Sequence, residues 1–224
     1  MIEVSDVSHA YGDRTVLRSV SVTLTEDRVA IIGPNGSGKS TFARLLNGLV
    51  LPQRGDVRVD GLSTRTDAAA VRRRVGFVFT DPDAQIVMPT VAEDVAFGLR
   101  PLRLGRDMTR QRVRAALAAV GLQAFTDQPA HVLSSGEKQL LALCSVLVTE
   151  PRVLVCDEPT TLLDRRNSRR IMQLLAGLSQ QVVLVTHDVD AVTDYERVLL
   201  FDEGRIVADG LPAGVVSRYL ALTA

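Results

Sequence analysis

The sequence predicts an α/β fold, because strand-like and helix-like segments alternate along the chain and its last strands are almost continuously apolar. Apolar strand-like runs bounded by turn signals lie at 2–7, 19–24, 29–32, 56–59, 75–79, 153–156, 182–185 and 198–201. The last three have the pattern of strands buried on both faces of a parallel sheet. We therefore expect a parallel sheet in the second half of the chain and a sheet-rich first third.

Helical spacing dominates the middle of the chain. From residue 91 to about 150, apolar residues recur at positions three and four apart, and Gly121 marks a helix end within that stretch. A last helix is expected from Pro212 to Leu220. We expect one domain over residues 1–224, with a helical subdomain inserted at approximately 91–150.

Composition excludes several classes of protein. With 46% hydrophobic and 23% charged residues, the chain is neither disordered, collagen-like nor a disulfide scaffold. Lys+Arg and Asp+Glu number 26 each, so no bulk positive field attracts nucleic acid. No apolar run reaches the ~18 residues of a membrane-spanning helix, and the first ten residues lack the features of a signal peptide. These features predict a cytosolic location.

The chain contains two cysteines and three histidines. Cys144 and Cys156 each lie in an apolar segment, which predicts small buried hydrophobic residues and no metal or redox site. His9 and His131 lie outside any chemical motif, and we expect structural roles for both.

A glycine-rich loop follows the strand at 29–32. The loop reads Gly33-Pro34-Asn35-Gly36-Ser37-Gly38-Lys39-Ser40-Thr41 and matches the phosphate-binding pattern G-x4-G-K-[ST] in the required strand-to-helix context. Its glycines let backbone N–H groups point at phosphate oxygens, and the following helix adds the positive end of its dipole. Lys39 is expected to contact the β- and γ-phosphates, and the Ser40 hydroxyl to ligate Mg²⁺.

Two adjacent carboxylates follow the buried strand at 153–156. Ligands of α/β sheets bind at the carboxyl ends of strands, so Asp157 is expected to hold Mg²⁺ and Glu158 to activate the water that attacks a γ-phosphate. His187 follows the strand at 182–185 and is expected at the same edge of the sheet, in contact with the γ-phosphate. Together with the loop, these residues predict a P-loop ATPase.

The segment Leu133-Ser134-Ser135-Gly136-Glu137-Lys138-Gln139 resembles the signature motif of ABC ATPases. The resemblance extends over essentially the whole chain, from Tyr11 through the phosphate loop, the signature and the acidic pair to Asp164 and His187. It implies a RecA-like P-loop NTPase core with an antiparallel β subdomain and an inserted helical subdomain, and it implies ATP and Mg²⁺ as ligands.

The resemblance also implies residue roles and a dimer. Tyr11 would stack on adenine, although a turn aromatic beside Gly12 is the alternative for that residue. Asp164 would lie across a dimer interface. The signature of one subunit would complete the nucleotide site of another in a head-to-tail dimer, most simply with a second copy of this chain. Independently, Ser134 and Gly136 open an apolar helix that could offer a hydroxyl, N–H groups and a helix dipole to an anion.

The sequence departs from the family pattern at three positions. Ser135 stands where the signature normally has its second glycine, and Glu137 stands where glutamine is common. Thr80 stands where the family has a glutamine that contacts Mg²⁺ and the attacking water. A hydroxyl has a shorter reach than an amide, so we expect either a weakened contact at Thr80 or an amide supplied by Gln85.

The segments at 81–85 and 90–98 resemble the corresponding part of energy-coupling-factor ATPases, which drive the uptake of vitamins and of cobalt or nickel. In that family this region receives a membrane coupling subunit, so we expect the partner surface at Gln85 to Phe97 and a peripheral location at the cytoplasmic face of the membrane. A substrate-binding membrane subunit is the third expected component. The short C-terminus favours the biotin type, with cobalt, nickel or another vitamin as the alternative. A non-importer ATPase, of the exporter, cell-division or soluble kind, is the remaining alternative.

Overall fold

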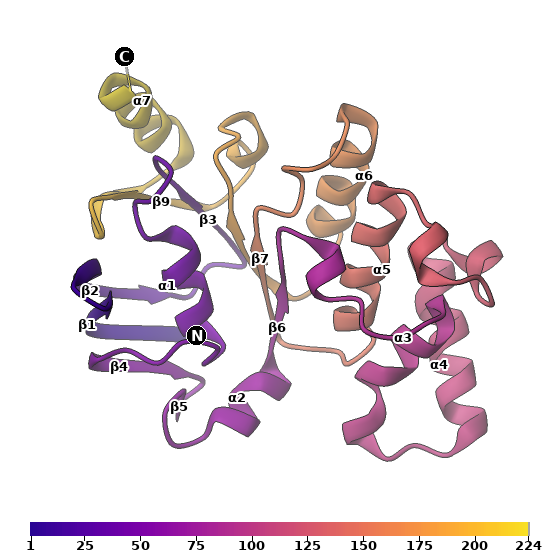
Figure 1. Cartoon of the computed structure of the whole chain (residues 1–224). Coiled ribbons are helices and arrows are strands. Elements are labelled where there is room, and N and C mark those ends of the chain that lie inside the picture. Colours follow the sequence, from indigo (N-terminus) through magenta and orange to yellow (C-terminus); the bar gives the residue numbers. More distant parts are fainter. Residues whose placement is uncertain (224) are drawn as a thin grey trace. The chain divides into compact units, whose positions relative to one another are not determined.

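A six-stranded sheet in the order β10-β9-β3-β8-β7-β6 is the larger of two sheets in the computed structural model, which describes residues 1–223 (Figure 1). β3 pairs in parallel with β8 and β9, β7 pairs in parallel with β8, and β10 pairs with β9 in the antiparallel sense. The strands are β3 (Arg28–Ile32), β6 (Val75–Val78), β7 (Val153–Asp157), β8 (Gln181–Val185), β9 (Arg197–Asp202) and β10 (Arg205–Gly210). The predicted parallel sheet is thus confirmed. β10 was not predicted, because its residues are only half-buried and form no apolar run.

The second sheet has the strand order β2-β1-β4-β5, and each neighbouring pair of strands is antiparallel. Its strands are β1 (Ile2–Tyr11), β2 (Arg14–Leu24), β4 (Arg54–Val59) and β5 (Leu62–Ser63). Helix α1 (Lys39–Leu46) contacts β2 and β4 of this sheet and β7 and β8 of the other. The ring of Phe42 on α1 packs against Phe201 on β9, with centroids 5.0 Å apart. α1 is therefore held from two sides, which fixes the loop that precedes it.

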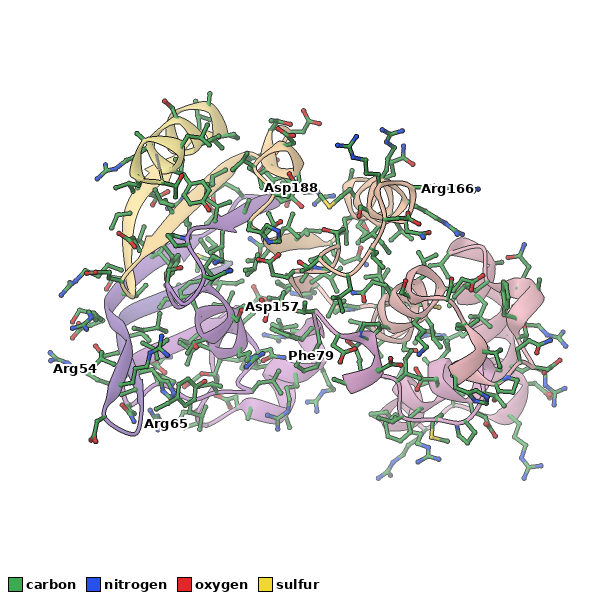
Figure 2. All side chains as sticks on the ribbon, turned by 45° about the horizontal axis from the view of Figure 1, so that its top comes forward. Arg54, Arg65, Phe79, Asp157, Arg166 and Asp188 are labelled. Atoms are coloured by element: carbon green, nitrogen blue, oxygen red, sulfur yellow. The ribbon has the colours of Figure 1, made fainter. Side chains whose placement is uncertain are left out.

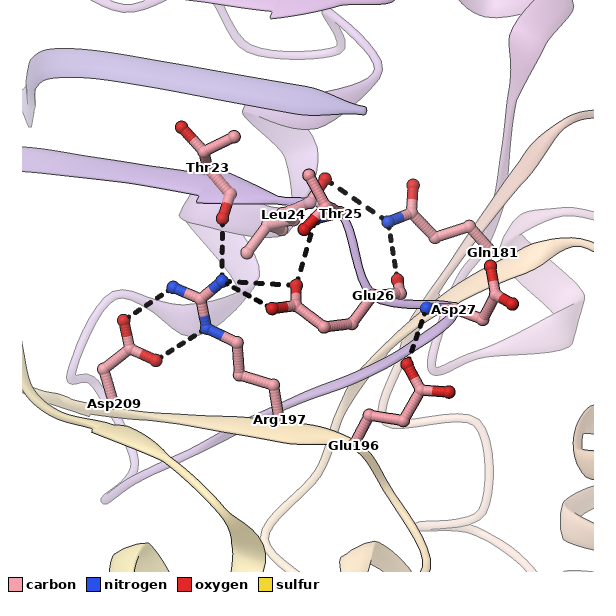
Figure 3. Close-up of polar contacts among 9 residues, drawn as sticks. All are labelled: Thr23, Leu24, Thr25, Glu26, Asp27, Gln181, Glu196, Arg197 and Asp209. Carbon is pink, nitrogen blue, oxygen red and sulfur yellow. Dashed lines mark hydrogen bonds and ion pairs between the residues drawn. The ribbon is translucent and has the colours of Figure 1, made fainter.

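A polar cluster around Arg197 joins the end of β2 to β9 and β10 (Figure 3). The guanidinium donates to both carboxylate oxygens of Asp209, at 2.7 and 2.8 Å, and to Glu26 at 3.0 Å. It also donates to the carbonyl of Thr23 at 2.8 Å. Burial raises the pKa of Glu26, but backbone hydrogen bonds and Arg197 outweigh it and the pKa is lowered. This cluster fixes the chain immediately before β3.

The chain divides into two compact units. The first unit comprises 1–76, 152–158 and 179–224 and contains both sheets except the end of β6. It also contains α1, α2 (Ala68–Arg74) and α7 (Pro212–Thr223). The second unit comprises 77–151 and 159–178, so it includes the predicted helical segment 91–150 together with residues on both sides of it.

The second unit is built from helices. They are α3 (Val91–Gly98), α4 (Arg106–Ala119), α5 (Ser135–Leu147) and α6 (Arg165–Ala176). Single-turn 3₁₀ segments lie at Pro82–Ala84, Arg100–Leu102, Gln123–Phe125 and Ala130–Val132, and a fifth, Asp190–Val192, belongs to the first unit. α5 contacts α3, α4 and α6, which explains why residues 159–178 belong to this unit although they follow β7 in the sequence. No helix within residues 1–223 is long and apolar enough to cross a membrane.

Both thiols are buried, as predicted. Cys144 on α5 is 1% exposed, and burial raises the pKa of its thiol to about 12. Cys156 on β7 is fully buried, and its thiol pKa is raised further for the same reason. Neither thiol is ionised near neutral pH, so both side chains act as small hydrophobic residues.

Candidate nucleotide site

The glycine-rich loop between β3 and α1 uses backbone conformations that favour glycine. Gly33, Gly36 and Gly38 have φ angles of 145°, 79° and 106°. A Cβ at Gly38 would lie 2.7 Å from the carbonyl oxygen of Val16 and 2.9 Å from the side chain of Leu17. The loop can therefore curl tightly only because these positions carry no side chain.

Several donors in this loop fit a phosphate group. α1 begins after Gly38 without a side-chain cap and without an acidic residue in its first turn, so its first N–H groups and dipole are open to an anion. The Ser37 hydroxyl is buried and has no hydrogen-bond partner among the described residues. Asn35 is exposed at the rim of the loop, and Thr41 is buried in the first turn of α1.

Lys39 lies inside the curve of the loop. Its Nζ donates to the carbonyl oxygens of Gly33 at 2.8 Å and Pro34 at 2.9 Å, and the residue is 6% exposed. Burial lowers the pKa of the ammonium group, while the charges of Glu158 and Asp157 oppose that shift. An anion in the loop would provide the counter-charge that a buried ammonium requires.

Ser40 and Asp157 meet, although 117 residues separate them. The Ser40 hydroxyl donates to Asp157 Oδ1 at 2.8 Å, and Asp157 is 1% exposed at the carboxyl end of β7 (Figure 2). Burial raises the pKa of this carboxyl group, and the Ser40 hydrogen bond and Arg44 oppose the shift. Arg44 lies 3.8 Å from Asp157 Oδ2. The contact of Arg44 with Asp157 is not predictable from the sequence pattern, because it depends on how α1 packs against β7.

The donor set at Ser40 and Asp157 fits Mg²⁺. Both groups supply oxygen, the atom that hard divalent cations prefer. Among residues 1–223, no group of three His, Cys, Asp or Glu side chains could hold a metal ion. A Mg²⁺ site needs only one or two protein ligands, because phosphate oxygens and water complete its coordination.

Glu158 and His187 are also in direct contact. His187 Nδ1 lies 2.7 Å from Glu158 Oε2, and the Glu158 N–H donates to the carbonyl of Val185 on the neighbouring strand. Glu158 has a φ of 54°, an uncommon conformation for a residue with a side chain, and such conformations concentrate at functional sites. Its side chain is 14% exposed, so the carboxylate is shielded but accessible.

Tyr11 ends β1 with its ring half-exposed, at 50%. The buried ring of His9 packs edge-on against it, with centroids 4.8 Å apart and an interplanar angle of 79°. Neither ring nitrogen of His9 has a hydrogen-bond partner among the described residues. An exposed aromatic face backed by a buried ring suits the stacking of a planar base. His131, by contrast, is exposed in the second unit.

The signature residues begin α5 in the second unit. Ser134 is the N-cap, and its hydroxyl donates to Glu137 Oε2 at 2.7 Å and accepts a long hydrogen bond, 3.4 Å, from the Glu137 N–H. The Ser134 N–H also donates to Glu137 Oε2, at 2.8 Å. These contacts form a capping box. Ser135 is exposed and Gly136 is buried, where a Cβ would meet the amide of Asn167.

The other predicted site residues also lie in the second unit. Thr80 is half-buried after β6. The Gln85 side-chain amide makes two hydrogen bonds within this unit. Its oxygen accepts from the Phe79 N–H at 3.1 Å, and its NH₂ group donates to the Ala142 carbonyl at 3.1 Å. Asp164 caps α6 by accepting from the Asn167 N–H at 2.8 Å. The structure thus brings the phosphate loop, Asp157, Glu158 and His187 together in one unit.

Comparison with known proteins gives a consistent family assignment. A model of the ABC transporter family matches residues 17–161. A protein of Deinococcus radiodurans, named as an ABC transporter ATP-binding protein without a substrate, is 52% identical over 219 residues, covering 98% of this chain and 97% of the relative. The biotin transport ATP-binding protein BioM of Rhizobium etli is 42% identical over 223 residues, covering 100% of this chain and 99% of the relative. The cobalt import ATP-binding protein CbiO of Syntrophus aciditrophicus is 43% identical over 226 residues, covering 97% and 81%.

Two solved structures are similar over nearly the whole chain. CbiO1 of Clostridium perfringens, part of the ABC transporter complex CbiONQ, superposes with a TM-score of 0.86 at 33% identity, covering 99% of this chain and 93% of that one. The ATP-binding cassette MJ0796, solved as a dimer in a post-hydrolysis state with ADP and Pi, superposes with a TM-score of 0.85 at 28% identity, covering 95% and 99%.

Proposed function

This chain belongs to the ABC transporter ATPases, and from that premise we propose that it is the energy-coupling subunit of a membrane importer of the energy-coupling-factor type. Hydrolysis of ATP is the activity of the family. The observation that carries the proposal is the meeting of Ser40 with Asp157 and of Glu158 with His187 beside the phosphate loop. Relatives named for biotin transport and cobalt import, aligned over 97% or more of this chain, support the importer role.

In this proposal, different residues of the first unit bind the phosphates, hold the metal ion, activate water and stack on the base. The loop N–H groups, the Ser37 hydroxyl and Lys39 bind the β- and γ-phosphates. Ser40 and Asp157 hold Mg²⁺, which supplies charge neutralisation of the phosphates when bound. Glu158 accepts the proton of the attacking water, and His187 orients its carboxylate through the 2.7 Å contact and reaches the γ-phosphate. Tyr11 stacks on the adenine ring.

Two residues of the second unit are proposed as further metal contacts. Thr80 takes the place of the usual glutamine and contacts Mg²⁺ through its shorter hydroxyl side chain. Gln85 could supply an amide only if its bonds to Phe79 and Ala142 break, so we favour Thr80. In a Thr80→Gln variant, turnover and Mg²⁺ dependence should both change. Unchanged values would remove Thr80 from this role.

A second copy of the chain completes each site in this proposal. Ser134, Ser135, Gly136 and Glu137 of one copy would contact the γ-phosphate held by the loop of the other, and Asp164 would lie at the interface. Support comes from the dimer of the similar cassette MJ0796. A head-to-tail pair with two bound ATP molecules is closed by two-fold symmetry.

The proposed partner surface is the segment Gln85–Phe97. Its loop is anchored by buried Asp94, whose Oδ1 accepts from the N–H groups of Val87 and Met88 at 2.9 and 3.1 Å. Val87 is 61% exposed and Phe97 is 42% exposed. A rigid backbone that presents apolar side chains suits the docking of a helix from a membrane coupling subunit. With a separate substrate-binding membrane subunit, that complex would hold this chain at the cytoplasmic face of the membrane.

Biotin is the cargo we propose, with cobalt, nickel or another vitamin as the alternative. This choice depends on the relatives named for biotin transport and cobalt import alone. An exporter, cell-division or soluble ATPase is the competing class.

The deciding experiment is affinity purification of the tagged chain from native membranes in mild detergent, followed by mass spectrometry. Recovery of a coupling membrane protein and a small substrate-binding membrane protein would support the importer role, and the bound ligand would identify the cargo. Recovery of soluble proteins alone would contradict it. A separate control tests the ATPase activity without the membrane partners. Purified Glu158→Gln protein should bind ATP but not hydrolyse it.

A further inference from the structure

The hairpin between β1 and β2 holds Arg14 opposite Tyr11. β1 ends at Tyr11 and β2 begins at Arg14, and the register pairs these two residues directly (Figure 1). Directly opposed residues of an antiparallel pair project from the same face of the sheet, with Cβ atoms about 5 Å apart. Gly12, with a φ of 57°, begins the tight turn between them. The Arg14 side chain therefore starts beside the half-exposed ring of Tyr11.

The guanidinium group of Arg14 reaches the phosphate loop. A Cβ at Gly36 would lie 3.5 Å from Arg14 Nη2, so the guanidinium lies beside the backbone of the loop. Gly36 is exposed at the rim, whereas Lys39 is buried inside the curve and bonded to loop carbonyls. The two cations therefore occupy different positions, with Arg14 at the rim on the side of Tyr11 and Lys39 in the interior.

Backbone contacts hold the first half of β2 against the same loop. The Arg18 N–H donates to the carbonyl of Gly204 at 2.9 Å, and the Gly204 N–H donates to the carbonyl of Ser37 at 3.0 Å. A Cβ at Gly38 would lie 2.7 Å from the carbonyl oxygen of Val16, so the loop and β2 pack backbone against backbone. The start of β2 is therefore fixed relative to the phosphate loop.

The charge of Arg14 is not compensated within the part of the chain that the structure describes. Its side chain is exposed, and its guanidinium forms neither an ion pair nor a side-chain hydrogen bond within residues 1–223. A guanidinium carries five N–H donors in a planar fork that matches the oxygens of a phosphate group. All five donors are available to a ligand that extends from the Tyr11 ring to the loop.

We propose that Arg14 binds the α-phosphate of the nucleotide. This inference rests on the proposed function, in which adenine stacks on Tyr11 and the β- and γ-phosphates bind inside the loop at Lys39. The ribose and the α-phosphate connect those groups, so they span the distance from the Tyr11 ring to the loop, where the Arg14 guanidinium lies. The α-phosphate is the charged group on that path, and two parallel N–H donors of the guanidinium bind its oxygens.

The test is isothermal titration of the purified chain with ATP and with ADP, in EDTA so that ATP is not hydrolysed. Arg14→Ala should weaken the binding of both nucleotides by the same factor, about tenfold, because both carry an α-phosphate. Arg14→Lys should recover part of the loss, since it keeps a point charge without the paired donors. A loss for ATP alone would place the guanidinium at the γ-phosphate, and unchanged affinities would leave it in solvent. Either result would overturn the proposal.

Arg18 provides a matched control on the same strand. It is exposed, its guanidinium has no ion pair within the described chain, and its backbone bond to Gly204 survives substitution. Arg18→Ala should change both affinities by less than about twofold, because its charge is largely screened. An equal loss at Arg14 and Arg18 would show a general effect of positive charge and overturn the α-phosphate contact.

Two further readouts separate this proposal from other causes. The melting temperature of Arg14→Ala should match that of the wild type, because substitutions of exposed side chains rarely change stability. A lowered melting temperature together with equal losses in the Arg14→Lys variant would indicate a structural role and overturn the contact. Failure of the wild-type chain to bind either nucleotide would instead contradict the proposed function itself.

Discussion

The starts of α1 and α5 were both predicted to bind phosphate, yet their N-termini differ. α1 begins after Gly38 without a side-chain cap and with no acid in its first turn. α5 begins at Ser134 with a complete capping box and with Glu137 in its first turn. Each of these helices also carries one of the two lysines of the chain. Lys39 on α1 is buried in the loop, whereas Lys138 on α5 forms an ion pair with Asp83 at 2.7 Å.

The difference shows how one chain can hold a primary and a conditional anion site. The donors of α1 face no competing carboxylate, so a phosphate meets a prepared site. The hydroxyl and N–H of Ser134 are already bonded to Glu137, whose negative charge opposes an anion at the same helix end. In the proposed dimer, a phosphate held by the second copy would therefore have to displace an internal hydrogen bond in order to bind at α5.

The largest expected effect is at Lys39. Lys39→Ala removes the charge-assisted bonds to two phosphates, and ATP affinity should fall at least 100-fold, which is about 3 kcal/mol. Isothermal titration with ATP and Mg²⁺ measures this. Lys138→Ala on α5 is the control and should bind ATP within about twofold of wild type. Equal losses in both would mean that the two helix starts share the primary site.

Gly38→Ala tests whether the open end of α1 depends on backbone geometry. The substitution should lower the free energy of unfolding by about 2–3 kcal/mol, because alanine is strained at a φ of 106° and its Cβ would overlap Val16 and Leu17. Chemical denaturation measures it. Gly136→Ala at α5 needs only a shift of the Asn167 side chain and should stay within about 1 kcal/mol. A larger loss at Gly136 would reverse the comparison.

Ser134→Ala removes the N-cap of α5. Loss of the cap should lower the free energy of unfolding by about 1 kcal/mol and the melting temperature by about 2–4 °C. Thermal unfolding followed by circular dichroism measures this. The neighbouring exposed Ser135, replaced by alanine, should leave the melting temperature unchanged. No shift at Ser134 would mean that the capping box adds nothing to the stability of α5.

The smallest expected effect is that of Glu137→Gln, which should tighten ATP-dependent dimerisation. Glutamine can keep the capping box while the negative charge is lost. ATP-dependent dimerisation in a Glu158→Gln background, measured by sedimentation, should therefore tighten about threefold, and high salt should reduce the gain. Weaker dimerisation would indicate that the Glu137 charge assists phosphate binding.

Local motifs were the most predictable part of the site. The phosphate loop could be predicted because its glycines, lysine and serine act within nine consecutive residues. The contact of His187 with Glu158 was foreseeable in outline, since both follow neighbouring parallel strands. The orientation of Arg44 toward Asp157 was not, because it depends on how α1 packs against β7.

The hydrogen bonding of the signature residues is the part of the site that the sequence predicts least well. The pattern Ser134-x-x-Glu137 is itself a capping-box signal, so the donors of Ser134 that the sequence offers to an anion are bonded to Glu137 in the structure. Gln85 shows the same limit, because an amide that looks available in the sequence makes two bonds to backbone groups at Phe79 and Ala142. Sequence identifies donors, whereas tertiary packing decides which of them are already used.

The burial of both cysteines bears on tolerance to oxidants. Cys156 directly precedes Asp157 on β7, so a sulfenic or sulfinic group there would add polar volume to the packed core beside the strand end that carries the proposed metal ligand. Full burial keeps that thiol protonated and out of reach of peroxide. Cys144, 1% exposed, has the same protection. The nucleotide site should therefore keep its rate without added reductant and through episodes of oxidative stress.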